Sequence, residues 1–538
     1  MLPSTSPPKQ NVPIFSFKST RLRIGLLLMF GLFSSTSMRL NLSMAVVCMV
    51  NSTAFESSTA ISYTNTTEVV LDTSSCKSPS TAEDLIAEGY SGTLLWSPEK
   101  VSLLLSGTFY GGLLTTWWSG YLADRFGPKI ILLTVVANFA FFTLLTPTLA
   151  NTSFLALFGA RFVMGLGEGF VFPSLSSMAA RWFPPSERST FAAIYTSGNQ
   201  IAAVFALLIS SYLCGATFLG GWPSIFYLFA TIGCIWIVFW VLLSSNTPES
   251  NSFISEEEVL YIRQQTSEQG SRKVGSNKLS TAPVPWMKMA SSPAVYANLV
   301  AQFSFNFSAS LLQTYLPTYM KQVLRVNIGK NGVYAMLPFL TQLISKNIFG
   351  ILSDFLKKRG VLTNSQAVKI FQLFVTEALA GNIGASVCFL TLGLFIDCER
   401  TGVAVGVLAL YGIFFSSGIP GFFTSLLSIA PSFTGTLFSL SMLSGTIANA
   451  VSPGLVGLIN KHGTGEEWMI IWLATAFINI VAAIVFFFFG SGDVQEWAKT
   501  HNDQGNPDFN KIHDIENLSM EKKKSPSNSE RRISQVSN

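Results

Sequence analysis

A few of the long apolar stretches of this chain contain charged side chains, which apolar stretches usually lack. Arg39 lies well inside the apolar run that begins near residue 24, and Arg161 and Glu168 lie inside the run RFVMGLGEGFVFP. A charge within a membrane-spanning stretch is costly and usually functional. A guanidinium that faces a water-filled cavity can bind a carboxylate or a phosphate through two parallel hydrogen bonds. The alternative for Arg39 is that it reaches the headgroup layer or pairs with an acid for stability alone.

Arg161 and Glu168 are seven residues apart, which places them on one face of a helix and two turns, or about 10 Å, from each other. Gly165, Gly167 and Gly169 surround the carboxylate and permit close helix packing or a water-filled pocket. Burial favours the protonated form of a carboxyl group, and a nearby Arg favours its charged form. Glu168 is therefore predicted to act in proton coupling or ion pairing, and a purely structural Arg–Glu pair is the alternative.

Other polar residues within apolar runs are weaker candidates. Lys346 lies eight residues before Asp354, where a long amine can extend to the headgroups, and Glu377 can lie near the end of its own run. Tyr110 and Asn306 are predicted to join Arg39, Arg161 and Glu168 as substrate- or ion-binding residues. Further polar side chains that can line a path, or merely hold helices together, are Tyr195, Asn199, Gln200, Gln302 and Gln313.

The chain has no pattern typical of an enzyme. Its three histidines lie outside the apolar runs, its six cysteines follow no metal-ligand spacing, and no Gly-rich phosphate loop ends in Lys-Ser or Lys-Thr. We therefore expect no catalytic residues, no metal and no cofactor. Cys48 and Cys214 lie in apolar runs, where a thiol acts as a small hydrophobe. Cys76 and Cys398 are the two that can join a disulfide if their side of the membrane is oxidising.

The elements that must position these residues are membrane-spanning helices. Of the 538 residues, 49% are hydrophobic and only 12% are charged, about half the charged share of a soluble chain. The apolar runs reach the roughly 20 residues that a bilayer core requires. Twelve spans are predicted, at about 24–50, 100–123, 129–149, 154–180, 190–214, 223–245, 294–321, 331–353, 370–396, 403–428, 434–459 and 468–490.

The distribution of Lys and Arg predicts the orientation of these spans. If the N-terminus is cytoplasmic, the cytoplasmic segments hold 24 of the 34 Lys and Arg, the opposite side holds seven and the spans hold three. This bias predicts that both termini are cytoplasmic, and the net charge of +5 reflects topology rather than nucleic-acid binding. Asn65, within Asn-Thr-Thr, is a candidate glycosylation site in the large outer loop. The predicted divisions are an N-terminal segment 1–23, a six-helix half 24–245 with the loop 51–99, a linker 246–293, a second half 294–490 and a disordered tail 491–538.

A repeated loop relates the two halves. GYLADRFGPK (Gly120–Lys129) follows the second span, and GILSDFLKKR (Gly350–Arg359) follows the second span of the later half. A small residue allows helices to approach closely, and an Asp can accept hydrogen bonds from helix N-termini or Arg partners. Gating of a rocking motion is therefore predicted for Gly120, Asp124, Arg125, Gly350 and Asp354. The alternative is that these charges only anchor the loops at the headgroups.

This arrangement resembles the major facilitator superfamily, whose halves rock about a midplane site. MRLNLSMAVVCMVN, GLGEGFVFPSLSSMAARWFPPSERS, LPTYMKQVL, NGVYAMLPFL and IAPSFTGTLFS are similar to motifs of its anion:cation symporter family, which includes sialin, type I sodium–phosphate cotransporters and vesicular glutamate transporters. The resemblance implies an all-α fold of twelve spans and places Arg39, Arg161 and Glu168 at the family's transport positions. Ser106 and Phe305 replace the His and Arg of glutamate carriers, and Ser176 replaces a His of sialin.

These observations predict a secondary active transporter of a small anion, either inorganic phosphate or an organic anion. Its partners would be the anion, the lipid bilayer and a coupling cation, sodium or the proton, and it would lie in the plasma membrane or in a vesicle or lysosome membrane. The alternatives are an anion channel and a non-transporting receptor or structural protein on the same fold. An exporter of cationic drugs would need an excess of acidic residues in the spans, and the spans have the reverse.

Overall fold

The computed structural model describes residues 16, 19–51, 92–184, 187–216, 220–264, 285–358, 382–416, 422, 425–426, 429–430 and 433–498. Asn65, Glu377, Cys76 and the tail 499–538 lie outside the described residues. Within the described part, the chain is almost entirely helical, and its one extended pairing is an isolated bridge between Val50 and Leu94.

Among the described residues, twelve helices of 13 to 31 residues lie at the predicted spans, and the predicted fold class is confirmed. The first six are α1 (Thr20–Met49), α4 (Pro98–Phe126), α5 (Pro128–Thr152), α6 (Phe154–Trp182), α7 (Arg188–Gly215) and α8 (Pro223–Leu243). The second six are α11 (Pro293–Gln322), α12 (Ile328–Lys358), α14 (Asn382–Leu394), α15 (Thr401–Ser416), α17 (Thr434–Ile459) and α18 (Gly465–Phe489). Shorter helices are η2 (Pro248–Ser250), α10 (Trp286–Ala290), η3 (Cys398–Arg400), η6 (Glu496–Ala498) and a helical segment at 256–264.

Local sequence explains where several helices begin and how apolar they are. Ser97 caps α4 and is followed by Pro98 and Glu99, and Thr464 forms a capping box with Glu467 at the start of α18. Among the described residues, seven helices are long and apolar enough to span a membrane by length and hydropathy alone. Four long helices, α1, α4, α11 and α12, are less apolar than this. Of these, α1 contains Arg39, α12 contains Lys346, and α11 carries several amide side chains.

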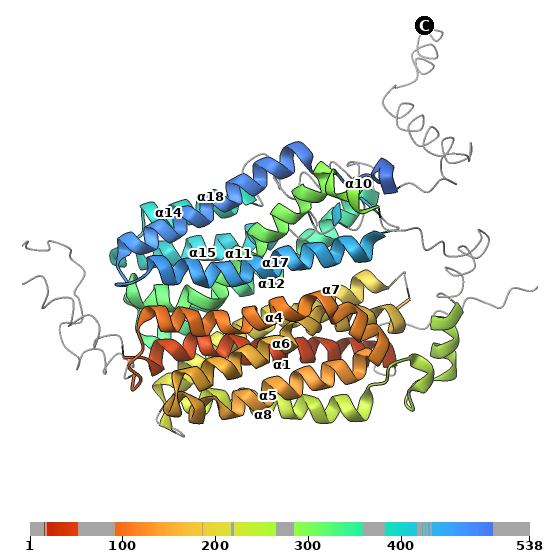
Figure 1. Ribbon diagram of the computed structural model, residues 1–538, viewed down its shortest axis with the longest axis horizontal. Coiled ribbons are helices and arrows are strands. Elements are labelled where there is room, and N and C mark those ends of the chain that lie inside the picture. Colours follow the sequence, from red (N-terminus) through yellow and green to blue (C-terminus); the bar gives the residue numbers. More distant parts are fainter. Residues whose placement is uncertain are drawn as a thin grey trace, which may run out of the picture.

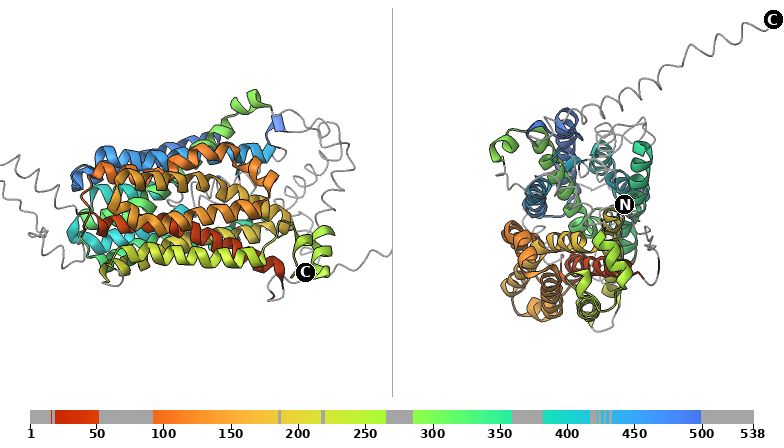
Figure 2. Two further views of the ribbon diagram at one scale, coloured as in Figure 1. Left: turned by 60° about the horizontal axis from the view of Figure 1, so that its bottom comes forward. Right: turned by 90° about the vertical axis from the view of Figure 1, so that its right-hand side faces the viewer.

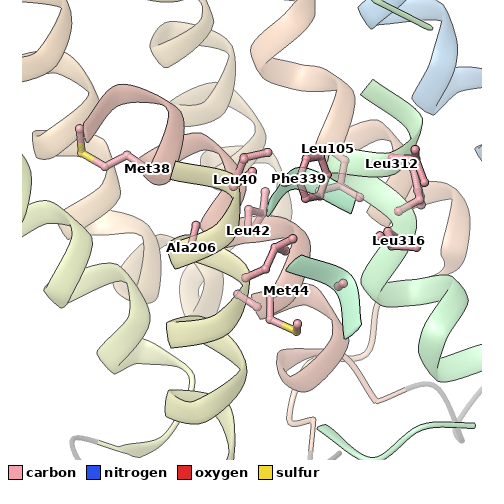
Figure 3. Close-up of a cluster of buried hydrophobic side chains, with 14 of the residues drawn as sticks. Met38, Leu40, Leu42, Met44, Leu105, Ala206, Leu312, Leu316 and Phe339 are labelled. Carbon is pink, nitrogen blue, oxygen red and sulfur yellow. The ribbon is translucent and has the colours of Figure 1, made fainter. Parts of the chain in front are cut away.

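The helices form two groups that correspond to the two halves of the chain (Figure 1, Figure 2). In the first group α1 packs on α7 and α8, and α6 packs on α4 and α5; in the second, α11 packs on α17 and α18, and α12 packs on α15. The groups meet where α7 contacts α12, α4 contacts α17 and α1 contacts α11. One buried apolar cluster runs through both groups and across this junction. Figure 3 labels some of its members: Met38, Leu40, Leu42 and Met44 of α1, Leu105 of α4, Ala206 of α7, Leu312 and Leu316 of α11 and Phe339 of α12.

Glycines bring α4 and α6 into direct backbone contact. A Cβ atom added to Gly165 would overlap the backbone carbonyl of Thr108, and one added to Gly111 would overlap the carbonyl of Phe162. The close packing predicted around Glu168 is therefore present, and it places α6 firmly against α4. Among the described residues, the close approach predicted at Gly120 is not seen, because none of their atoms lies within 4 Å of the position of an added Cβ atom.

The two halves are joined at the ends of the helices that the Lys and Arg bias places outside. Side chains of each half donate there to backbone carbonyls of the other: Ser102 to Pro453, Ser211 to Ile328 and Lys321 to Val47. At the opposite, inner end of α4, Trp117, Trp118 and Tyr121 are all about two-thirds exposed. Among the described residues, these three side-chain-to-backbone hydrogen bonds thus tie the halves together at the outer side.

A disulfide joins Cys48, near the outer end of α1, to Cys214, near the outer end of α7, with 6.1 Å between the Cα atoms. The interpretation of these two residues as plain buried hydrophobes is wrong, because the ends of two helices 166 residues apart in the chain meet here. Cys398 is also disulfide-bonded, whereas Cys234 and Cys388 are free.

A buried ion cluster lies at the inner end of the first six helices. Arg21 is fully buried and donates from Nη1 to Glu187 Oε2 at 2.5 Å and from Nε to Glu258 Oε1 at 2.9 Å. Glu258 also accepts from the backbone N–H groups of Thr20 and Arg21, at 3.0 and 3.1 Å. Burial by itself raises the pKa of Glu258, but these hydrogen bonds outweigh burial and hold the pKa below its ordinary value. The helical segment 256–264 is thereby tied to the first turn of α1.

Candidate functional site

Arg39 lies at the centre of the candidate site and contacts both halves. Its Nε is 3.7 Å from Glu168 Oε1 on α6, and its Nη2 donates to Gln313 Oε1 on α11 at 3.3 Å. The guanidinium carbon lies 5.4 Å from the centre of the Phe109 ring on α4. The side chains of Arg39 and Glu168 are 13% and 24% exposed, so both are accessible. At 3.7 Å the pair is an ion pair without a short hydrogen bond, and a better acceptor can replace the carboxylate.

The predicted pairing of Arg161 with Glu168 is replaced by the pairing of Arg39 with Glu168. The two residues of α6 do share a face, but two turns separate them by more than an ion pair can bridge. Arg161 instead donates from Nη1 to the Met38 carbonyl and from Nη2 to Thr146 Oγ1, both at 3.3 Å. Its guanidinium lies 5.8 Å from the Phe226 ring centre.

Arg161 is therefore enclosed within the first six helices. Only 1% of it is exposed, and its contacts are with α1, α5 and α8. One of them is the carbonyl of Met38, the residue that precedes Arg39, so Arg161 holds the backbone of α1 where Arg39 meets Glu168. Arg161 thus contacts the backbone of α1 next to Arg39 rather than Glu168, and its predicted role in substrate or ion binding stays a prediction.

Lys346 does not extend to the headgroups. It is 9% exposed, and its Nζ donates to Thr196 Oγ1 on α7 at 2.6 Å, across the junction of the halves. Among the described residues, no carboxylate oxygen lies within 4.0 Å of this ammonium. The interpretation of Lys346 as a snorkelling amine is wrong, because α12 packs against α7 and turns this side chain toward the neighbouring helix.

The remaining polar candidates differ in their contacts, and Gln313 is the one that contacts Arg39. Asn306 donates to the Gln302 carbonyl of its own helix at 2.9 Å and lies against Gly445 of α17. Tyr110 is half-buried beside Phe109 in the sequence of α4. Gln313, one of the amides predicted to line a path, is the α11 amide that contacts Arg39, and only the packing of α1 against α11 shows that they are partners. Phe305 is stacked on Phe415, with ring centres 4.1 Å apart.

The gating candidates occupy the ends of α4 and α12. Asp124 and Asp354 lie within these helices, but their side chains, and Gly350, lie outside the described part. Arg125 is exposed and donates from Nη1 to Tyr121 Oη at 3.0 Å. Gating by these residues stays a prediction.

The charge balance of the site decides what it can attract. The described middle parts of the helices contain three cations, Arg39, Arg161 and Lys346, and one carboxylate, Glu168. No group of His, Cys, Asp or Glu side chains suited to a metal ion occurs among the residues that were described. In a low-dielectric interior, such an excess of positive charge attracts an anion and repels a cation.

Comparisons with known proteins agree with this geometry. The family model described as Major Facilitator Superfamily matches residues 28–453. The protein named "Uncharacterized transporter slc-17.3" of Caenorhabditis elegans is 33% identical over 517 residues, which are 94% of this chain and 94% of that protein. Sialin of Homo sapiens is 33% identical over 484 residues, 89% of this chain and 91% of sialin. A bacterial homologue of the human lysosomal transporter Spinster, solved inward-facing and unoccupied, has a TM-score of 0.60 at 14% identity and covers 88% of this chain and 97% of its own.

Proposed function

Because the chain belongs to the Major Facilitator Superfamily and, within it, to the anion:cation symporter family that includes sialin, we propose that it moves a small carboxylate- or phosphate-bearing anion across a membrane by alternating access. The protein is a multi-pass membrane transporter and not an enzyme. The substrate class, the coupling and the membrane orientation are the parts of this proposal that need a test.

The observation that supports an anionic substrate is that cationic side chains outnumber carboxylates in the described middle parts of the helices. Arg39 is the accessible one, Arg161 supports it, and Lys346 has no carboxylate partner among the described residues. A buried charge without a partner costs several kcal/mol, about the scale of a protein's whole stability margin. An anion that enters the site compensates this cost, whereas a cation increases it.

The Arg39–Glu168 pair supports a mechanism of coupling. An entering carboxylate or phosphate has two oxygens in a plane that match the Arg39 fork, so it displaces the single oxygen of Glu168 at 3.7 Å. Glu168 then lies beside an anion in a low-dielectric site, and both negative charges are destabilised. Uptake of a proton or a sodium ion by the Glu168 carboxylate relieves this repulsion. Anion and cation thereby enter together, which is symport.

The orientation proposed is that both termini are cytoplasmic. The Cys48–Cys214 disulfide lies at the end of the helices that this orientation exposes to the outside or to a lumen, where disulfides persist. The membrane proposed is the plasma membrane or that of a vesicle or lysosome.

Transport by purified protein in liposomes tests the proposal. Radiolabelled phosphate, glutamate, N-acetylneuraminate and a monocarboxylate are offered in turn, with sodium and pH gradients imposed separately. We expect saturable uptake of at least one anion that one of the two gradients accelerates. Uptake of none of them, or ionic currents far above carrier turnover, would refute the proposal in favour of a non-transporting protein or a channel.

Arg39→Lys and Arg39→Ala test the site itself. Loss of two charge-assisted hydrogen bonds should lower uptake by at least about tenfold in both variants, because Lys keeps the charge but not the fork. Arg400→Lys, at an exposed Arg outside the junction, is the matched control and should transport normally. Undiminished uptake by Arg39→Ala at equal protein amount would exclude Arg39 from the site.

A further inference from the structure

Lys346 is a buried cation that the coupling mechanism leaves unused. It lies on α12 in the second half of the chain, whereas Arg39, Glu168 and Arg161 all lie in the first half. Its one hydrogen-bond partner within the described part of the chain is Thr196 Oγ1, at 2.6 Å on α7. The side chain therefore lies at the junction between the halves, as Arg39 does through Gln313.

The depth of Lys346 relative to Arg39 follows from contacts between helices. Thr36, one turn inward from Arg39 on α1, donates to Asn199 Oδ1 on α7 at 3.3 Å. Thr196 lies one further turn inward from Asn199 on α7. Each three-residue step along a helix rises about 4.5 Å. The Lys346 ammonium therefore lies about 9 Å from the level of Arg39, on the side of the proposed cytoplasmic face.

The hydrogen bonding of Lys346 leaves room for an acceptor. An ammonium has three N–H donors, and Thr196 Oγ1 takes one of them. Thr196 does not neutralise the charge, because a hydroxyl carries none; it accepts from Lys346 while it donates to the Ala192 carbonyl at 2.6 Å. A buried ammonium whose described partner is a neutral hydroxyl is costly, and the remaining donors suit the oxygens of an anion.

We propose that Lys346 is a second cationic contact for the transported anion, on the inner part of its path between α7 and α12. This inference rests on the proposed function, since it concerns the same carboxylate- or phosphate-bearing substrate. The anion binds Arg39 near the middle of the protein and Lys346 about two helical turns nearer the cytoplasm. Because Arg39 belongs to the first half and Lys346 to the second, the anion contacts each half of the transporter in turn.

The test uses the full-length protein in liposomes and the radiolabelled anion that wild type carries in the panel above. Lys346→Met keeps the length and the apolar stem of the side chain but removes the charge. We expect its KM to rise at least about tenfold, the loss of one charge-assisted contact, and Lys346→Arg to recover most of the affinity. Lys330→Met, at an exposed Lys near the outer end of the same helix, is the matched control and should keep the wild-type KM.

Thr196→Val separates an anion contact from a structural link between the halves. This variant removes the hydrogen bond and retains the ammonium. If Lys346 binds the anion, Thr196→Val keeps KM within about threefold of wild type. If the bond only ties α7 to α12, Thr196→Val reproduces the kinetics of Lys346→Met, and the proposal is wrong.

Thermal unfolding gives a second readout. Replacement of a buried ion by a well-packed apolar side chain is often neutral or stabilising. We therefore expect Lys346→Met to melt at or above the temperature of wild type, and a clear loss of thermal stability would assign Lys346 to structure instead. If wild-type protein transports none of the panel anions, the proposed function and this inference are both wrong. If wild-type protein transports an anion and Lys346→Met has the same KM, only this inference is wrong.

Discussion

Glu258 offers the sharpest test of how the linker between the halves is held. Its carboxylate is 1% exposed and accepts hydrogen bonds from Ser19 Oγ, from the backbone N–H groups of Thr20 and Arg21, and from Arg21 Nε, at 2.9 to 3.1 Å. Glu258→Gln keeps the shape of the side chain but turns one oxygen into an N–H donor. Because Oε1 takes three of these bonds and Oε2 takes the one from Thr20, a correctly placed Gln loses at least the Thr20 bond.

The size of the effect follows from these contacts. One charge-assisted bond is worth about 1.5 to 3 kcal/mol, and the bonds that remain to a neutral amide are each weaker than before. Arg21 keeps Glu187 as a partner, so the buried guanidinium is not left wholly uncompensated. We therefore expect Glu258→Gln to lower stability by about 3 kcal/mol. For a unit of 150 to 250 residues this corresponds to a fall of roughly 6 to 12 °C in Tm.

Thermal unfolding in detergent, followed by tryptophan fluorescence, measures this effect. Glu257→Gln changes an exposed neighbour on the same helical segment and should stay within about 2 °C of wild type. If Glu258→Gln also stays within that range, the cluster of Arg21, Glu187 and Glu258 does not stabilise the protein and the reasoning is refuted.

The pH dependence adds an independent check. The pKa of Glu258 is lower in the folded protein than its ordinary value of 4.5, so its contribution is complete above pH 4.5 and is lost as pH falls through the depressed value. The difference in Tm between wild type and Glu258→Gln should therefore be constant from pH 5 to pH 8 and should shrink below about pH 4.5. Within the described part of the chain, the charged or titratable groups in contact with this cluster include Arg21, Glu187 and Tyr261, and Tyr261 donates to Glu187 Oε1 at 2.9 Å. A difference that grows on acidification would contradict the assignment.

Two further predictions concern the first six helices. Arg161→Met should lower the maximal rate of uptake at least about tenfold with little change in KM, because Arg161 positions α1 through the Met38 carbonyl. A large rise in KM with an unchanged maximal rate would instead indicate that Arg161 contacts the anion directly. Gly165→Ala should reduce the amount of folded protein and lower its Tm by several degrees, because the added Cβ atom overlaps the Thr108 carbonyl. Gly159→Ala on the same helix meets open space and should be tolerated. Equal behaviour of the two variants in size-exclusion chromatography and thermal unfolding would contradict the close packing of α4 and α6.

Much of the fold could be predicted from the sequence because the bilayer acts locally. A stretch of about 20 apolar residues can form a membrane-spanning helix independently of the rest of the chain. The twelve described helices therefore lie at the apolar runs. The close packing around Gly165 was predictable for a similar reason, since a small residue in a span removes a steric barrier to its neighbour. The choice of Arg39 and Glu168 also came from local context, because a charge in an apolar run is conspicuous by itself.

By itself, then, the sequence determined the class of protein, the number of spans and the residues that could bind an anion. Only the tertiary structure decided which partner each of them has. Arg39 meets Glu168 and Gln313, Arg161 meets the Met38 carbonyl, and Lys346 meets Thr196. In each of these pairs the partners are more than 100 positions apart in the chain. The physical reason is that such contacts depend on the rotation and depth of whole helices against one another. Those quantities are set by the packing of every side chain along each interface, and no spacing within a single helix records them.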